Sequence, residues 1–157
     1  METKVQDLQE TESNTKEDRF LVFTIGEQDY AIEIHYVIEI IEPMPLTPIP
    51  FLPGCIKGII NVRGDVIPVM DVRMRFGLPE QEYTEHTCII NLDNDGVSLG
   101  LIVDEVQSVM RIPESERMPL PDEQATEASM RYLKSVGSVN QGIQLLLDCD
   151  KLMDIQG

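Results

Sequence analysis

The sequence predicts an all-β fold, mainly strands with a few short helices, built as two five-stranded SH3-like β-barrels. Short runs of apolar and β-branched residues recur from residue 20 onward, and turn segments such as GEQD, RGD, DNDG and NQG lie between many of them. This pattern is typical of sandwiches and barrels. The sequence is also partly repeated, and each copy has roughly 60 residues, which suits a small barrel whose closed sheet hides its edges.

The N-terminal residues 1–19 differ from the rest of the chain. They are polar and charged and lack both Gly and Pro, so we expect an acidic tail that is disordered or forms a frayed helix. Residues 20–157 are expected to form a single domain made of two barrel subdomains.

Strands are expected wherever the apolar runs occur. The runs cover residues 20–26, 30–34, 39–44, 56–62, 66–70, 87–92, 97–103, 109–112, 135–139 and 142–147. Pro68 interrupts one of them and cannot donate to a sheet ladder, so we expect it at a barrel edge or a bulge. Gly64 supplies the backbone freedom that the Arg-Gly-Asp turn needs.

Helical patterns are few and short. Residues 35–40 are expected to form one or two turns. Residues 71–77 predict a compact helix, with Asp71 as its N-cap and Gly77 just past its end. The best pattern is 122–134, which has acidic residues at its start and Arg131 and Lys134 at its end. The proline-rich segments 46–54 and 118–123 should be extended and exposed links.

An internal repeat supports two copies of one unit. Residues 31–41 lie over residues 100–110 after a shift of 69 positions, and apolar residues coincide at Ile32 and Leu101, Ile34 and Val103, Val37 and Val106, Ile40 and Val109, and Ile41 and Met110. Residues 58–71 also resemble residues 137–148 when two residues are dropped near the turn. That alignment places Gly58 over Gly137, Asn61 over Asn140 and Asp71 over Asp148.

Composition argues against several kinds of partner. The chain has 28 acidic and 12 basic residues and a formal net charge of −16, which repels the phosphates of nucleic acids and anionic lipids. No secretory signal and no membrane-length apolar stretch occurs, so we expect a cytoplasmic protein without membrane insertion. Three widely spaced cysteines, Cys55, Cys88 and Cys149, are expected to be small core residues.

Catalytic and cofactor-binding patterns are missing from the sequence. It contains no phosphate-binding glycine loop, no nucleophile elbow and no HExxH motif. His35 and His86 are therefore expected at structural or surface positions. Asp93, Asp95 and Gly96 resemble the start of an EF-hand loop, but strand-like residues follow them, which favours a hairpin turn. We expect no catalytic residues, no metal and no cofactor, while an enzyme using carboxylates and a divalent metal is kept as an alternative.

Two opposite charges, Glu39 and Arg63, lie within otherwise apolar stretches. If their strands are neighbours, they could form a bidentate ion pair across a groove. Alternatively, they are two independent exposed charges. The sequence pattern leaves both possibilities open.

Three motifs in residues 20–155 closely resemble the CheW family of chemotaxis coupling proteins. They are V-x-E-I-I at 37–41, PIPFLPG at 48–54 and G-x-I-N-x-R-G-x-V-I-P-V-x-D at 58–71. The resemblance implies two intertwined five-stranded barrels with a hydrophobic groove between them. It also implies a scaffold without catalysis that joins the cytoplasmic tips of transmembrane chemoreceptors to the regulatory domain of the histidine kinase CheA.

The resemblance also implies the site. Val37, Glu39, Gly58 and Arg63 match family positions tied to receptor or kinase coupling, and Arg63 would hold Glu39 and shape that surface. The family's frequent leucines are replaced by valine at positions 62 and 72, which are mild changes of volume. A divergent coupler of a parallel, non-flagellar pathway, such as surface motility or gene regulation, is the main alternative within the family.

Overall fold

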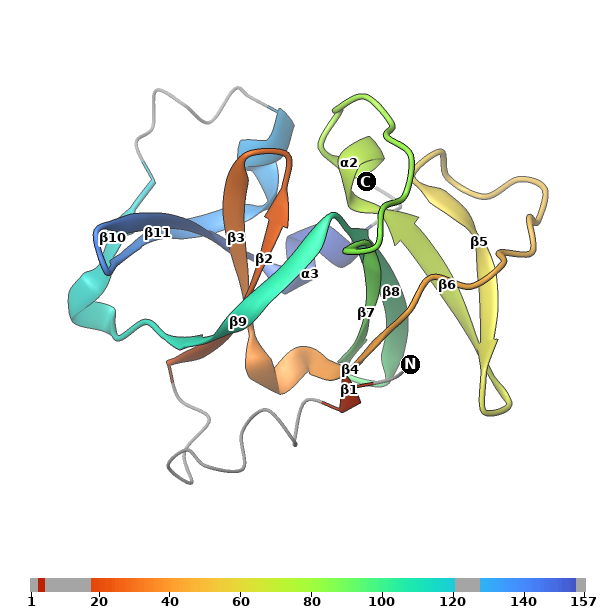
Figure 1. The fold of residues 1–157 in the computed structure, drawn as a ribbon, viewed down its shortest axis with the longest axis horizontal. Helices are drawn as coiled ribbons and strands as arrows, with labels where there is room; N and C mark the ends of the chain where they lie inside the picture. Colours follow the sequence, from red (N-terminus) through yellow and green to blue (C-terminus); the bar gives the residue numbers. More distant parts are fainter. Residues whose placement is uncertain (1–2, 5–17, 121–127, 155–157) are drawn as a thin grey trace.

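Two six-stranded sheets make up most of the molecule (Figure 1). The computed structural model describes residues 3–4, 18–120 and 128–154. Sheet 1 has the order β1-β4-β7-β8-β6-β5, and sheet 2 has the order β10-β11-β12-β3-β2-β9. In chain order, the elements are β1 (Thr3–Lys4), β2 (Arg19–Ile25), β3 (Gln28–Glu33), η1 (Ile34–Tyr36), β4 (Val37–Ile41), β5 (Ile56–Val62), β6 (Asp65–Asp71), α2 (Val72–Arg75), β7 (Cys88–Asn94), β8 (Val97–Val103), β9 (Glu105–Arg111), η2 (Glu114–Glu116), β10 (Arg117–Pro119), η4 (Ala128–Tyr132), β11 (Leu133–Val139), β12 (Gly142–Leu147) and α3 (Cys149–Met153).

Each sheet closes into a barrel, sheet 1 into barrel 1 and sheet 2 into barrel 2, and the two barrels exchange hairpins. Beyond β4, the backbone of Thr47 exchanges two hydrogen bonds of 2.9 Å with Ile59 of β5 and so joins the two ends of sheet 1. In sheet 2, β10 follows β9 in the chain and pairs with β11 at the opposite end. The hairpin β2–β3 belongs to the sheet of the later strands, whereas β7–β8 inserts between β4 and β6. The predicted all-β fold of two intertwined barrels is therefore confirmed.

The pairing register confirms the repeat of the first hairpin. Shifted by 69 positions, every pair of β2–β3 falls on a pair of β7–β8: Val22 with Ala31, for example, falls on Asn91 with Gly100. Each of these hairpins also pairs with one more strand: β7 pairs with β4, and β2 pairs with β9. These two pairings have the same register and a bulge at the same position. The same small unit is thus built twice, down to its irregularities.

The predicted alignment of the second hairpins needs a correction. The hairpins β5–β6 and β11–β12 have the same register and the same bulge when Asp148 is placed over Asp71, with no residue dropped. Gly58 therefore lies over Ser135, and Asn61 over Ser138. The sequence alignment followed identical glycine and asparagine letters, whereas the turn and the ladder fix the true correspondence.

One of the three helix predictions is confirmed. Helix α2 follows its prediction: Asp71 Oδ1 accepts from the backbone N–H of Arg73 at 2.9 Å, and Gly77 has φ 75°. The expected helix at 35–40 is wrong, because η1 supplies a single turn and strand β4 begins at Val37. Of the helix expected at 122–134, the part up to residue 127 lies outside the described residues, and the remainder is the 3-10 helix η4 followed by β11.

The expectation for the N-terminal tail stays a prediction for most of its length. Residues 1–2 and 5–17 lie outside the described residues. Thr3 and Lys4 form β1, which pairs with Ile40 and Glu39 of β4. Strand β2 already begins at Arg19.

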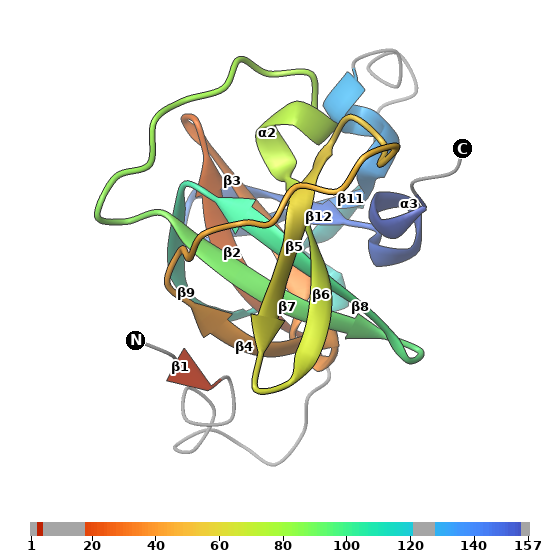
Figure 2. The ribbon, with the colours of Figure 1, turned by 90° about the vertical axis from the view of Figure 1, so that its right-hand side faces the viewer.

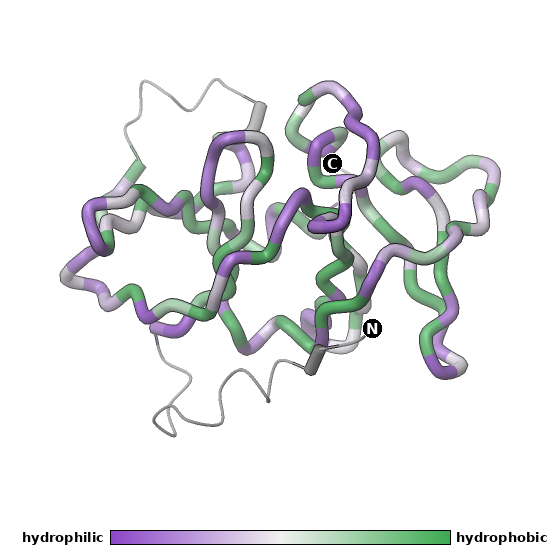
Figure 3. Tube along the Cα trace, viewed as in Figure 1, coloured by the Kyte–Doolittle hydropathy of each residue, from purple (hydrophilic) through white to green (hydrophobic). Residues whose placement is uncertain are grey.

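Three apolar clusters fill the molecule. One lies inside barrel 1, around Ile60 and Ile89, and another lies inside barrel 2, around Phe20 and Leu146. The largest cluster mixes residues of both sheets, such as Phe23 and Leu101, and so joins the barrels. Much of the trace along the strands is apolar, although β9 is mixed, and the tip of the β5–β6 hairpin is hydrophilic (Figure 3). This shared core packs the two barrels against each other.

Candidate functional site

The β5–β6 turn holds Arg63 at the end of barrel 1. Arg63 has φ 52° and Gly64 has φ 91°, the left-handed pair of a two-residue hairpin turn that matches the twist of the strands. Asn61 Oδ1 accepts the backbone N–H of Gly64 at 2.9 Å. A left-handed backbone costs a residue with a side chain about 1 kcal/mol, so an arginine is a poor choice for the turn itself.

Glu39 lies on β4 and is only 1% exposed. Its Oε1 accepts a hydrogen bond from Nη2 of Arg63, whose side chain is 54% exposed. Oε1 also accepts from Nδ2 of Asn91 on β7 at 3.5 Å, while Oε2 is buried without a hydrogen-bond partner among the described residues. The ion pair therefore forms, but it uses one carboxylate oxygen and is not bidentate.

Closure of the barrel brings Glu39 and Arg63 together. Strands β7, β8 and β6 separate β4 from β5 in the sheet order, so the two residues are not on neighbouring strands as the sequence argument required. The hairpin β5–β6 crosses in front of β7 and β8 (Figure 2), and its turn reaches the β4 end of the curled sheet. A carboxylate buried with incomplete hydrogen bonding is costly, and such exceptions to good packing are expected at functional sites.

Barrel 2 provides an internal comparison for this pair. By the shared registers, Ser108 lies where Glu39 lies, and Asn140 lies where Arg63 lies. Asn140 has φ 55°, and asparagine accepts this conformation readily. The same barrel therefore forms without the ion pair, so closure of the sheet does not require it.

Val37 and Gly58, the other two predicted site residues, lie inside the protein. Val37 is 6% exposed and belongs to the core that joins the barrels. A Cβ added at Gly58 would lie 2.6 Å from the carbonyl oxygen of Thr47, at the bridge that closes barrel 1. The structure thus pairs Glu39 with Arg63, whereas Val37 and Gly58 are buried away from that pair's exposed end.

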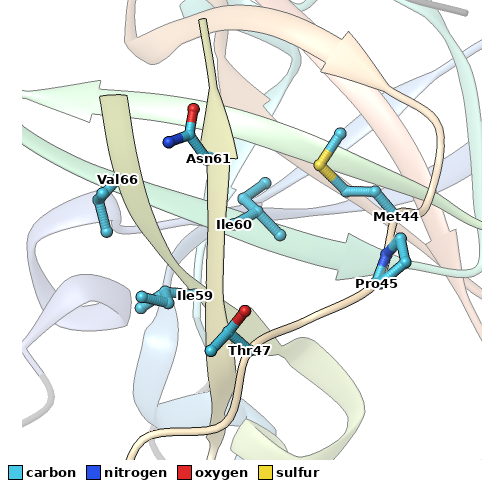
Figure 4. A pocket seen from close by; sticks show the side chains of 7 residues that line it. All are labelled: Met44, Pro45, Thr47, Ile59, Ile60, Asn61 and Val66. Carbon is cyan, nitrogen blue, oxygen red and sulfur yellow. The ribbon is translucent and has the colours of Figure 1, made fainter. Parts of the chain in front are cut away.

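An apolar hollow of about 490 Å³ lies beside this hairpin. It is lined by Met44, Pro45, Thr47, Ile59, Ile60, Asn61 and Val66 (Figure 4). Val66 is 60% exposed and Met44 is 36% exposed. Sequence reasoning missed this surface, although alternation along β6 could have indicated that Val66 points away from the core. Together with the arginine at the turn, the hollow offers an apolar contact area next to a positive charge.

A second polar contact, also missed from the sequence, connects the barrels. Arg73 of α2 donates to Asp104 through Nε at 3.0 Å and through Nη2 at 2.6 Å, and Asp104 accepts the backbone N–H of Gly26 at 2.7 Å. The hydrogen bond to Asp104 raises the pKa of Arg73. Burial alone would raise the pKa of Asp104, but the hydrogen bonds from Arg73 and Gly26 and the arginine's charge lower it. This contact ties α2 to the β2–β3 turn of the other barrel.

The remaining sequence predictions concern a metal site, the β7–β8 turn, the cysteines and a membrane span, all within the described ranges 3–4, 18–120 and 128–154. Within them, no group of three or more His, Cys, Asp or Glu side chains could hold a metal ion. Asp93 Oδ1 accepts the backbone N–H of Gly96 in the β7–β8 turn, as the hairpin interpretation expected. Cys149 is buried, and the partly buried Cys55 and Cys88 pack against the same core, which confirms their structural role. No described helix is long and apolar enough to cross a membrane.

Comparisons with known proteins point to one family. The sequence model of the CheW-like domain matches residues 19–156. The chain is 34% identical to the chemotaxis protein CheW of Klebsiella aerogenes over 134 residues, which are 85% of this chain and 80% of the relative. It is 32% identical to the chemotaxis protein CheW of Thermotoga maritima over 142 residues, covering 88% of this chain and 89% of that one. The crystal structure of the scaffolding protein TtCheW from Thermoanaerobacter tengcongensis matches with a TM-score of 0.80 and 29% identity, over 89% of this chain and 94% of that one.

Proposed function

The chain belongs to the CheW-like domain family, and on this premise we propose that it is a chemotaxis scaffold that couples the cytoplasmic tips of transmembrane chemoreceptors to the histidine kinase CheA. It acts in the cytoplasm by binding both partners and catalyses no reaction. Receptor conformation biases kinase activity through the complex, which is a coupling between two binding events. Family membership over nearly the whole chain is the observation that carries this proposal.

The geometry of barrel 1 supports a place for one of these contacts. The exposed guanidinium of Arg63 lies at the tip of a hairpin, and the apolar hollow lies along the same hairpin. Protein interfaces commonly combine an apolar centre with a charged rim. The buried end of the pair, at Glu39, keeps the arginine in a fixed position, so that less side-chain freedom is lost on binding.

Reconstitution of receptor, kinase and this protein tests the proposal. Kinase output is measured with and without the chain, and with the variant Arg63→Asp. The matched control is Asn140→Asp, which introduces the same residue at the equivalent turn of barrel 2. We expect Arg63→Asp to impair ternary assembly and Asn140→Asp to leave it close to wild type. Unimpaired assembly by Arg63→Asp would remove the site assignment, and failure of the wild-type chain to bind either partner would remove the function.

The alternatives named from the sequence are tested separately. A coupler of a parallel pathway would compete better for a CheA of that pathway than for the chemotaxis kinase, and a competition assay with both kinases decides between them. Calorimetric titration with Mg²⁺, Mn²⁺ and Ca²⁺ tests for a metal-dependent enzyme, which requires a specific heat of binding for one of these ions.

A further inference from the structure

A third polar residue, Asn91, accompanies the Glu39–Arg63 pair. It lies on β7 as the cross-strand neighbour of Glu39 and is only 7% exposed. Its Nδ2 lies 3.5 Å from Oε1 of Glu39 and donates a long, weak hydrogen bond to it, since N–H···O bonds are usually about 2.7–3.2 Å long. Its Oδ1 is buried, and no residue in the described part of the chain donates a hydrogen bond to it. An amide that is half satisfied in the barrel interior destabilises the fold relative to an apolar side chain of similar size.

Barrel 2 shows that the fold does not need an amide at this position. Val22 lies where Asn91 lies, is 2% exposed and packs in the apolar cluster inside that barrel. Its cross-strand neighbour is Ser108, the counterpart of Glu39. Three positions therefore differ together between the barrels: Glu39, Asn91 and Arg63 in barrel 1 correspond to Ser108, Val22 and Asn140 in barrel 2. At these three positions the amide accompanies the carboxylate and the arginine, whereas the buried amide of barrel 2, Gln144 of β12, lies at a different position.

We propose that Asn91 is a positioning residue, which orients the Glu39 carboxylate so that Arg63 is held in one place on the partner-binding surface. The effect of Asn91 on partner binding rests on the proposed function. The last torsion of a glutamate side chain is soft, and both Asn91 Nδ2 and Arg63 Nη2 donate to the same oxygen, Oε1. The amide thus favours the rotamer that presents Oε1 to the β5–β6 turn.

The substitution Asn91→Val separates positioning from simple core filling. Valine already occupies the equivalent place in barrel 2, so we expect the variant to fold. Its urea midpoint should stay close to that of the wild type, because removal of the unpaired amide oxygen stabilises the variant while the loss of one donor to the buried Glu39 carboxylate destabilises it. In the full-length chain alone, the Arg63 Nε–H resonance should move towards that of a free guanidinium. Affinity for the receptor tip or the kinase should fall roughly 3- to 10-fold, the effect expected of losing one modest hydrogen bond.

A matched background tests whether Asn91 acts through Glu39. The double variant Glu39→Ser with Arg63→Asn gives barrel 1 the residues of barrel 2 at those positions. Adding Asn91→Val to this background should change affinity by less than it does in the wild type, since there is no carboxylate left to orient. An equal loss of affinity in both backgrounds would overturn the proposal.

Two NMR readouts, the Arg63 resonance and the Asn91 side-chain amide resonances, test the position of the Glu39 carboxylate without any binding partner. If the wild-type chain binds neither partner, the proposed function fails, but the Arg63 resonance in Asn91→Val still decides whether Asn91 holds the pair. If Asn91→Val does not fold, the Asn91 side-chain amide is followed by NMR in Glu39→Ser, where its two proton resonances should shift from their wild-type positions. An Arg63 resonance unchanged by Asn91→Val, or Asn91 amide resonances unchanged by Glu39→Ser, would overturn the proposal.

Discussion

Asn140 occupies in barrel 2 the turn position that Arg63 occupies in barrel 1. Both residues have a left-handed backbone, with φ 55° and 52°, and both precede a second residue of positive φ in a hairpin of the same register. Equivalent positions of the two barrels can therefore be compared within one chain. Barrel 1 has the buried Glu39 and its arginine, whereas barrel 2 has Ser108 and Asn140 at the same positions.

Replacement of Arg63 by Asn should destabilise the chain even though the turn accepts asparagine. The variant leaves the buried Glu39 carboxylate without its cation, and we expect a loss of about 1–3 kcal/mol in the free energy of unfolding. The double variant Glu39→Ser with Arg63→Asn should recover most of this loss. Urea denaturation of the wild type, Arg63→Asn and the double variant measures both effects. If Arg63→Asn is as stable as the wild type, Arg63 does not stabilise the buried Glu39 carboxylate.

Replacement of Gly58 by Ala should weaken the closure of barrel 1. The new Cβ would lie 2.6 Å from the backbone oxygen of Thr47, so the bridge to Ile59 must shift, and overpacking of this kind costs about 1–3 kcal/mol. Gly54→Ala is the matched control, because nothing lies within 4 Å of a Cβ there. Thermal unfolding should separate the two variants, and equal stability of both would contradict the importance of this close approach.

The Arg73–Asp104 contact should make stability depend on pH in the acidic range. Against the effect of burial, the hydrogen bonds from Arg73 and Gly26 lower the pKa of Asp104 in the folded protein, so its contribution is fully present above the unfolded pKa, about 4, and is lost as the pH falls through the folded pKa. Asp104→Asn should cost roughly 1.5–3 kcal/mol near neutral pH. The difference between wild type and variant in urea denaturation should shrink as the pH is lowered to about 3. A difference that stays constant with pH would rule out this ionic contribution.

The three cysteines should react at different rates in the folded protein. Burial raises the pKa of Cys88 to about 11 and that of Cys149 to about 12, so their thiolates are scarce at neutral pH. With iodoacetamide, followed by mass spectrometry, Cys55 should be labelled first and Cys149 last. All three should react quickly in urea. Labelling of Cys149 at the rate of Cys55 in the native chain would contradict its placement in the core.

Local patterns predicted most of the elements, and their failures have local causes. Helix α2 begins after the Asp71 cap and ends before Gly77, as expected, because capping depends on neighbours in the chain. Residues 35–40 were expected to be helical, but pairing of β4 with β7 outweighed the short helical pattern. The second hairpins were aligned by letter identity and came out two residues apart from their true correspondence, since only the ladder records which residues face each other.

The sequence by itself determined the all-β class, the duplication, the absence of known catalytic motifs and the two charged residues that stand out from apolar strands, because periodicity and turn chemistry are written in neighbouring residues. Only the tertiary structure decided that Glu39 meets Arg63 through closure of the barrel, that Asn91 joins them, and that Val37 and Gly58 are buried. These relations depend on which ends of a curled sheet come together, and contacts between residues far apart in the chain leave no pattern in a single sequence.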